Sequence, residues 1–162
     1  MADPETISPS IGIRPLGDFP DSIPTLGEWH HREWSWLNPG KTLEDRIRKL
    51  EDSAVPGKIP CTFVAVSRGT LLGSASLIEE DMDTHRHLTP WLASVYIVSG
   101  QRGKGIGSLL VRGMMEEAKK LGIRRLYLFT PDRKHFYERL GWKVRETAPY
   151  RGQTVTIMET VP

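Results

Sequence analysis

A hexapeptide in the second half of the chain could bind a diphosphate. It reads Arg102-Gly103-Lys104-Gly105-Ile106-Gly107. Three of its residues have no side chain, so successive backbone N–H groups can turn toward one anion. A helix that starts here would add unpaired N–H groups and the positive end of its dipole, and the two cations would add full charges. The segment from Arg102 to Ser108 is therefore predicted to be a phosphate-binding loop.

The elements on either side of this loop are a predicted strand and a predicted helix. Residues 91–98 form an almost charge-free run of aromatic and branched side chains, which is typical of a strand covered on both faces. From Ile106 to Leu121 the apolar residues recur close to a 3.6-residue period. Lys120 and Gly122 supply the charge and the cap expected at the carboxyl end of that helix.

Three known glycine-rich patterns can be compared with the loop, and one fits in full. The phosphate-binding loop of nucleotidases requires Ser or Thr after its Gly-Lys pair, but Gly105 follows Lys104. The dinucleotide fingerprint requires glycine at a first, third and sixth position, and the glycines here are never spaced in that way. The third pattern is Gln or Arg, two residues, Gly, one residue, and Gly or Ala. Arg102, Gly105 and Gly107 satisfy it.

The third pattern is the coenzyme A loop of the GNAT superfamily of N-acetyltransferases, which this chain resembles over about residues 60–145. The segment Phe136-Tyr137-Glu138-Arg139-Leu140-Gly141-Trp142 also stands at the family's spacing. The resemblance implies an α/β (α+β) fold with a mixed, mostly antiparallel sheet of six to seven strands, about four flanking helices, and strands 4 and 5 splayed apart. It also implies acetyl-CoA as cofactor and direct transfer of the acetyl group to a primary amine in a ternary complex.

The resemblance assigns expected roles to further residues. Backbone groups of Val95, Tyr96 and Ile97 would pair with the pantetheine arm like an extra strand, and one N–H there would meet the thioester oxygen. Tyr137 occupies the position of a tyrosine near the sulfur, and a phenol with a pKa near 10 could protonate the departing thiolate. Thr130 departs from the pattern, because many members have an asparagine there that holds the pantetheine arm. The fourth strand contains no carboxylate, so the amine must lose its proton through water, to a neighbouring loop, or to solvent.

Size and composition predict one domain. A chain of 162 residues with 38% apolar content can build one sizeable core, so we expect a single domain over residues 11–162 after a flexible segment 1–10. Cys61 is the only cysteine, which excludes an intramolecular disulfide and a cysteine-based metal cluster, and no metal is expected. The sequence lacks a signal-peptide pattern and any run near the roughly 18 apolar residues of a membrane helix. A cytoplasmic protein with no membrane partner is expected, and a homodimer is left open.

Charge is distributed unevenly along the chain. The formal net charge of +2 argues against general nucleic-acid binding. Residues 1–100 hold 9 Lys and Arg against 14 Asp and Glu, whereas residues 101–151 hold 13 against 5. A basic second half suits a polyanionic cofactor, and an acidic first half could attract a cationic amine. Segregation of charge between two solvated faces is the alternative.

The other elements are predicted from periodicity and turn residues. Asp45 follows Thr42 by three residues, an arrangement typical of a helix cap. Pro56-Gly57 ends that helix, and Arg68-Gly69 indicates a hairpin turn. The expected elements are strands at 11–16, 61–67, 70–78 and 124–130, helices at 22–36, 42–53 and 133–140, and a final hairpin of 142–147 and 154–160 that turns at 149–152.

Several side chains outside the loop are secondary candidates. His30 and His31 would point about 100° apart on a helix, so a solvated or core-edge pair is favoured over a metal site. Trp34 and Trp36 are expected in the core, although the resemblance also places this region in the wall of the acceptor pocket. The loop before strand four is either solvated or supplies a proton acceptor near the acetyl group. Its ionisable residues are Glu79, Glu80, Asp81, Asp83, His85 and His87.

The identity of the acceptor is left open by the sequence. A small-molecule amine is preferred because small acceptors are commoner among compact members of the family. A protein amino terminus is the alternative, since Thr130–Gly141 resembles the actin N-terminal acetyltransferases over that short span. A non-catalytic module that binds or senses acyl-CoA is the third hypothesis.

Overall fold

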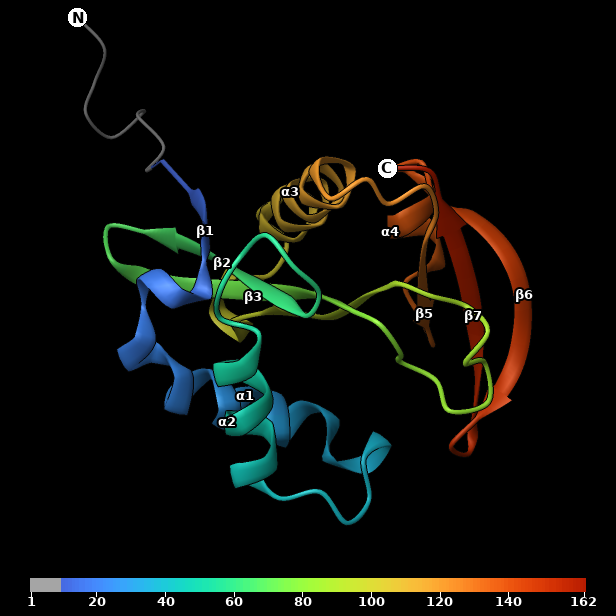
Figure 1. Cartoon of the computed structure of the whole chain (residues 1–162), viewed down its shortest axis with the longest axis horizontal. Helices are drawn as coiled ribbons and strands as arrows, with labels where there is room; N and C mark the ends of the chain where they lie inside the picture. The colour runs from blue at the N-terminus through green and yellow to red at the C-terminus, as the bar shows by residue number, and fades with distance from the viewer. Residues whose placement is uncertain (1–9) are drawn as a thin grey trace, which may run out of the picture.

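The computed structural model describes residues 10–162 and contains one seven-stranded sheet with the strand order β1-β2-β3-β4-β5-β7-β6 (Figure 1). The predicted flexible segment 1–10 lies outside the described residues except for its last residue. The strands are β1 Gly12–Pro15, β2 Cys61–Ser67, β3 Thr70–Ile78, β4 Trp91–Ile97, β5 Leu126–Thr130, β6 Lys143–Tyr150 and β7 Gln153–Thr160. The α-helices are α1 Ile23–Trp34, α2 Leu43–Asp52, α3 Ile106–Lys120 and α4 Lys134–Glu138.

The helices cover opposite faces of the sheet, with α3 and α4 on one face and α1 and α2 on the other (Figure 1). Because side chains alternate along a strand, β2 serves both layers. Phe63 and Ala65 belong to the large core under α3, whereas Val64 packs with Leu26 of α1 and Leu50 of α2. The core is therefore double, with one apolar layer on each face of the sheet.

Strands β4 and β5 diverge, as predicted. They are the one parallel pair in the described sheet, and a single register pair joins them, Trp91 with Tyr127. On its other edge β4 pairs with β3 along its whole length. Within that ladder Ser74 faces Tyr96 and Ser76 faces Ala93, so β4 carries one extra residue, and Ser94 there has a φ of 54°. This is a β-bulge at the point where the strands separate.

A long loop connects the two parts of the sheet that separate between β4 and β5. Residues 79–90 run from β3 across to the hairpin of β6 and β7. There Asp83 Oδ2 accepts a hydrogen bond from Arg151 at 2.8 Å, and His85 Nε2 lies 2.7 Å from Glu146 Oε1. Side chains of the loop, β4, β6 and β7 also share a separate apolar cluster.

Most predicted elements are confirmed within about two residues, and the capping box of Thr42 and Asp45 is present. The predicted last turn is wrong. It comprises Arg151 and Gly152 alone, with φ of 52° and 82°, which is the two-residue turn that matches strand twist, so Pro149 belongs to β6. None of the helices in residues 10–162 combines the length and the apolar character that crossing a bilayer requires.

Candidate active site

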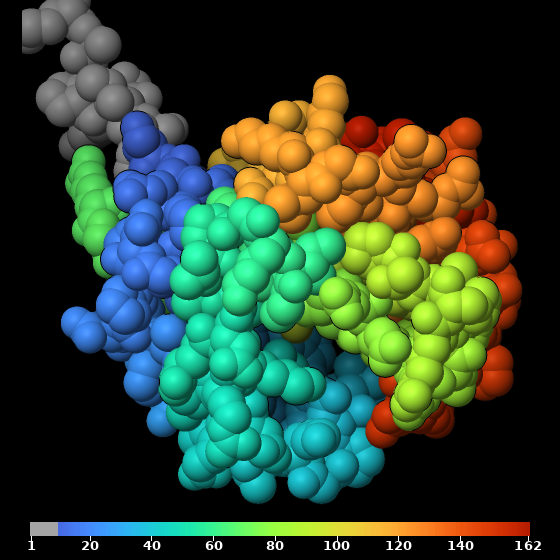
Figure 2. Space-filling view, viewed as in Figure 1, coloured from blue at the N-terminus to red at the C-terminus, as the bar shows by residue number. Residues whose placement is uncertain are grey.

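A groove of about 1270 Å³ passes through the sheet where β4 and β5 diverge. Its lining comes from the start of α3 and from α4 on one face, and from α1, α2 and the end of β3 on the other. Figure 2 shows the molecule hollowed between α2 and the loop 79–90 on the second face. A ligand lying in the groove can therefore be reached from both sides of the sheet.

The phosphate loop, residues 102–108, forms the α3 end of the groove. Gly103 and Gly105 have φ of 78° and 82°, and a Cβ at either position would meet open space. Within the described part of the chain, the N–H groups of residues 103–108 have no hydrogen-bond partner in the backbone. Gly105 also precedes α3 as its N-cap residue. Unpaired N–H groups, bare backbone and a helix dipole thus meet at one place, which suits a diphosphate.

The side chains of this loop contribute unequally. The Arg102 side chain donates from Nε to the Ile97 carbonyl at 3.1 Å and lies 5.9 Å from the Tyr96 ring centre, which holds its charge over the groove. Lys104 is exposed, its Nζ is 3.4 Å from Gln101 Oε1, and it is not part of the groove lining. Ile106 is buried in the core, so its N–H is the part of it that can face a ligand.

The exposed edge of β4 forms the floor of the groove. Val95, Tyr96 and Ile97 line it, and beyond Trp91 the β5 side of this strand has no ladder partner among the described residues. An extended chain lying in the groove would meet the same N–H and C=O pattern as a neighbouring strand. The bulge at Ser94 interrupts the ladder next to this edge.

Tyr137 lies on α4 and faces the groove from the α3 side. Its ring is buried against Phe136 and Trp142, and its hydroxyl makes no hydrogen bond to a described residue. Burial raises the pKa of Tyr137 to about 12, with Arg133 opposing and Asp132 adding to the shift. The phenol therefore keeps its proton throughout the neutral range.

Thr130, at the end of β5, uses its hydroxyl locally. Thr130 Oγ1 accepts from the Arg133 backbone N–H at 2.9 Å and caps the turn that leads into α4. The side chain thus positions the helix that carries Tyr137. It can still donate its own hydroxyl proton into the groove, which it lines.

The opposite end of the groove, which we term the acceptor mouth, is rich in ionisable side chains. Carboxylates line it at Glu33, Glu79, Glu80 and Asp81. Burial raises the pKa of half-buried Asp81 to about 7, although the charges of Arg46 and Lys49 act to lower it. Trp34 and Trp36, for which both a core position and a place in the pocket wall were considered, line the groove as well.

Two of the secondary candidates behave differently from expectation. His30 is neither solvated nor at the core edge: it is fully buried, with Nε2 2.8 Å from Ser74 Oγ, and burial lowers its pKa to about 3. His85 lies against Glu146 of β6 and, like His87, is absent from the described groove lining. Of the ionisable loop before β4, the carboxylates at its start are the groups that reach the groove.

Sequence reasoning missed Arg46 and Lys49. Both lie on α2 and line the groove from the α1 and α2 face. In the sequence they are two of several cations on an ordinary amphipathic helix, and no local signal distinguishes them from Arg48. Their positions depend on how α2 packs against α1.

Comparison with known proteins gives one family. The model of the acetyltransferase (GNAT) family matches residues 23–142. The ribosomal-protein-alanine N-acetyltransferase of Brucella melitensis is 22% identical, with a TM-score of 0.74 over 93% of this chain and 99% of that chain. The yncA protein of Salmonella typhimurium, solved with its cofactor acetyl-CoA, is 19% identical, with a TM-score of 0.73 over 94% of each chain.

A curated relative matches over a shorter span. The N-alpha-acetyltransferase 80 of Mus musculus is 36% identical over 63 residues, which is 39% of this chain and 19% of the mouse protein. The chain therefore matches about a fifth of the length of that relative. The family model, by contrast, spans most of the chain and its predicted loop. The chain belongs to the GNAT acetyltransferase family.

Proposed function

We propose that the chain is an acyltransferase that moves the acetyl group of acetyl-CoA directly to a primary amine, and that the acceptor is a small molecule. The observation that carries the proposal is the groove itself. It connects an anion cradle on the α3 face with an acidic mouth on the α1 and α2 face, through the divergence of β4 and β5. Two reactants that enter from opposite faces meet inside the sheet, which fits transfer in a ternary complex.

Binding of the acetyl donor is assigned to backbone groups. The N–H groups of Gly103 to Ser108 hold the diphosphate, aided by Arg102. The free edge of Val95, Tyr96 and Ile97 orients the pantetheine arm. A backbone N–H beside the bulge donates to the thioester oxygen and stabilises the charge that develops on it. The donor supplies an activated acetyl group as a thioester.

The amine must lose a proton before it can attack, and we assign Asp81 as the acceptor of that proton, directly or through one water. A carboxylate with an ordinary pKa near 4 is a weak base at neutral pH. Burial raises the pKa of Asp81 to about 7, which makes it a better base while leaving a large fraction ionised. Its position in the acceptor mouth places it on the side from which the amine arrives.

Tyr137 is assigned to the other proton, the one that the departing thiolate takes up. A phenol with a pKa of about 12 is a weak acid, so the thiolate must be a strong base for the transfer to proceed. Burial raises the pKa of a thiol, so a thiolate enclosed in the groove is more basic than one in water. The amine proton passes to Asp81, the Tyr137 proton passes to sulfur, and solvent restores both groups.

The proposal is tested by incubating the protein with acetyl-CoA and a panel of primary amines while free thiol is measured. We expect thiol release that depends on one class of amine, together with the N-acetylated product by mass spectrometry. Calorimetry with coenzyme A provides the control for folding of the donor site. If coenzyme A binds and no amine supports thiol release, transfer to an amine is excluded.

Turnover should rise with pH from about 6 to 9. Two deprotonations favour the reaction over this interval, that of Asp81 near pH 7 and that of the amine at higher pH. Asp81→Asn should lower turnover about tenfold or more near neutral pH and remove the rise centred near 7. Asp83→Asn, in the same loop but outside the groove, is the matched control and should leave the profile unchanged. A rate that falls over this range in folded protein contradicts attack by an amine.

A protein amino terminus is the second candidate acceptor. The match of 63 residues to N-alpha-acetyltransferase 80 favours it over other macromolecular acceptors. Short peptides with free amino termini, added to the amine panel, distinguish the two. Turnover with peptides well above that with every small amine would replace the small-molecule proposal.

A further inference from the structure

An arginine at the acceptor mouth carries a charge that no described residue neutralises at close range. Arg46 is half-buried on α2, and its guanidinium makes neither a hydrogen bond nor an ion pair within residues 10–162. Burial lowers the pKa of the Arg46 guanidinium, with the charge of Asp81 opposing. A partly buried charge with no counter-ion at bonding distance is costly, and its free donors can be satisfied by a ligand.

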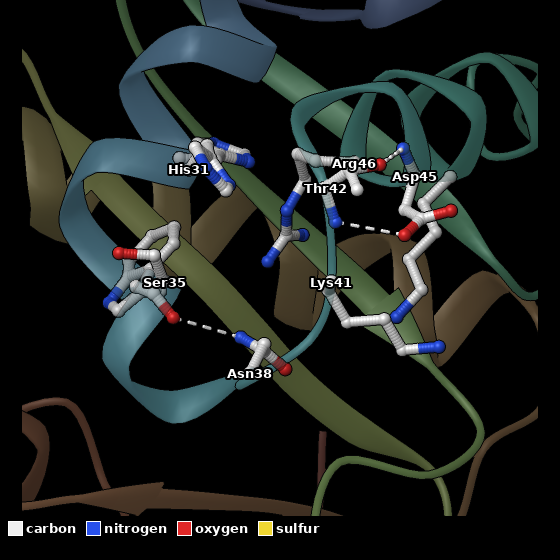
Figure 3. Close-up of a pocket in the computed structure, with 10 residues that line it drawn as sticks. His31, Ser35, Asn38, Lys41, Thr42, Asp45 and Arg46 are labelled. Atoms are coloured by element: carbon white, nitrogen blue, oxygen red, sulfur yellow. Dashed lines mark hydrogen bonds between the residues drawn. The ribbon is translucent and has the colours of Figure 1, made fainter.

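Further cations surround Arg46 and add to this cost. Lys49 lies one helical turn away, and burial together with the charges of Arg46 and Lys41 lowers the pKa of its amine. The carboxylate of Asp45 compensates little, because it caps α2 at Thr42, lies 3.7 Å from Arg48, and has the smallest effect of the charges that act on the pKa of Lys49. Figure 3 shows Asp45 held by Thr42 while Arg46 extends from α2 into the space beside the end of α1.

A small cavity of about 20 Å³ lies between α1 and α2 at this place. Its size suits about one water molecule. Trp34, Asn38, Arg46 and Lys49 line both this cavity and the large groove, so the two spaces adjoin at these four residues. His30 lines the cavity too, and its buried Nδ1 has no hydrogen-bond partner among the described residues. An unpartnered buried polar atom and an unpaired arginine thus border the same space.

We propose that Arg46 and Lys49 bind a carboxylate of the acceptor, so that the acceptor is a primary amine with a carboxylate a few bonds away. The inference rests on the proposed function and names its substrate class. Asp81, Arg46 and Lys49 line the same end of the groove, so one small molecule can place its amine at Asp81 and its carboxylate at Arg46. A planar guanidinium is suited to bind a carboxylate through two parallel hydrogen bonds.

Two kinds of acceptor carry a primary amine and a nearby carboxylate: a free amino acid, and a peptide whose first residue is acidic. Steady-state kinetics with three sets of acceptors distinguish the two. The sets are free amino acids, the same amino acids as amides, and peptide amides that start with Asp, Glu or Ala. Neutralising the carboxylate as an amide should raise KM about tenfold or more with a smaller effect on kcat. Preference for free amino acids assigns the small acceptor, and preference for acidic peptides assigns the protein amino terminus.

The decisive variant is Arg46→Gln, compared with Arg48→Gln on the exposed side of the same helix. Arg46→Gln should raise KM for the carboxylate acceptor about tenfold or more, while KM for its amide and the affinity for coenzyme A stay unchanged. Arg46→Lys should restore part of the loss, and Arg48→Gln should resemble the native chain. Thermal denaturation checks that each variant is folded.

A binding measurement tests the carboxylate subsite independently of the proposed transfer reaction. Calorimetry with the amino acid is carried out on protein saturated with coenzyme A, where no reaction can occur. Heat of association that Arg46→Gln abolishes and Arg48→Gln retains supports the subsite even if no turnover is found. Equal KM values for acid and amide in the native chain, or equal binding by both variants, overturn it.

Discussion

Gly105→Val is expected to weaken the binding of coenzyme A at least about tenfold. Gly105 has a φ of 82°, a conformation that a β-branched residue adopts only at a cost of about 1–3 kcal/mol. A loop that changes conformation to relieve this strain no longer presents its N–H groups to the ligand, so the cost lowers the affinity for coenzyme A. A valine side chain would also enter the open space above the N–H cradle. Since 1.4 kcal/mol is a factor of ten, calorimetry resolves the loss.

The matched control is Gly122→Val at the other end of α3. Gly122 has a φ of 76°, and its Cβ position is equally open, but it lies after the helix and away from the groove. This substitution should lower the melting temperature through the same kind of strain and leave the affinity for coenzyme A unchanged. Similar losses of affinity in both variants would show that backbone strain, not the cradle, explains the first result.

Tyr137→Phe is expected to lower turnover at least about tenfold and to leave the affinity for coenzyme A nearly unchanged. The substitution removes one hydroxyl, which has no hydrogen-bond partner among the described residues, so ring packing against Phe136 and Trp142 is preserved. With a pKa of about 12, Tyr137 is protonated at every pH at which the enzyme works, so the loss should be of similar size from pH 6 to 9.

Tyr127→Phe serves as the comparison for this result. Tyr127 lies on β5 with its side chain in the separate apolar cluster and outside the groove lining. Steady-state rates and calorimetric affinities are measured for both variants. An unchanged turnover in Tyr137→Phe removes the phenol from the mechanism and leaves protonation of the thiolate to water.

The donor half of the groove could be predicted from sequence because its chemistry is local. A run of seven residues carries the glycines, the cations and the start of the helix, and the adjacent strand continues directly into it. The splay of β4 and β5 follows from the same resemblance and is confirmed. Gly103 and Gly105 both have a positive φ, which residues with a side chain rarely adopt, so few other sequences can form this loop.

The acceptor half could not be predicted in this way, because distant segments build it. Glu33, Arg46 and Asp81 come from α1, α2 and the loop after β3, and they come together only after the helices pack on the sheet. In the sequence, Asp81 is one of several carboxylates in a polar loop, and tertiary burial alone raises its pKa to about 7. His30 shows the same limit, since neighbours from β3 and β4 bury a side chain that the helical pattern left at the core edge.

The single register pair between β4 and β5 has a consequence for the heat resistance of the molecule. It makes the sheet two smaller sheets, β1–β4 and β5–β7, whose connection is reinforced by the pairs Asp83 with Arg151 and His85 with Glu146. An extended ligand between them supplies the main-chain bonds that are missing there. The melting temperature should therefore climb with the concentration of free coenzyme A, because every bound molecule joins the two sheets into one cooperative unit.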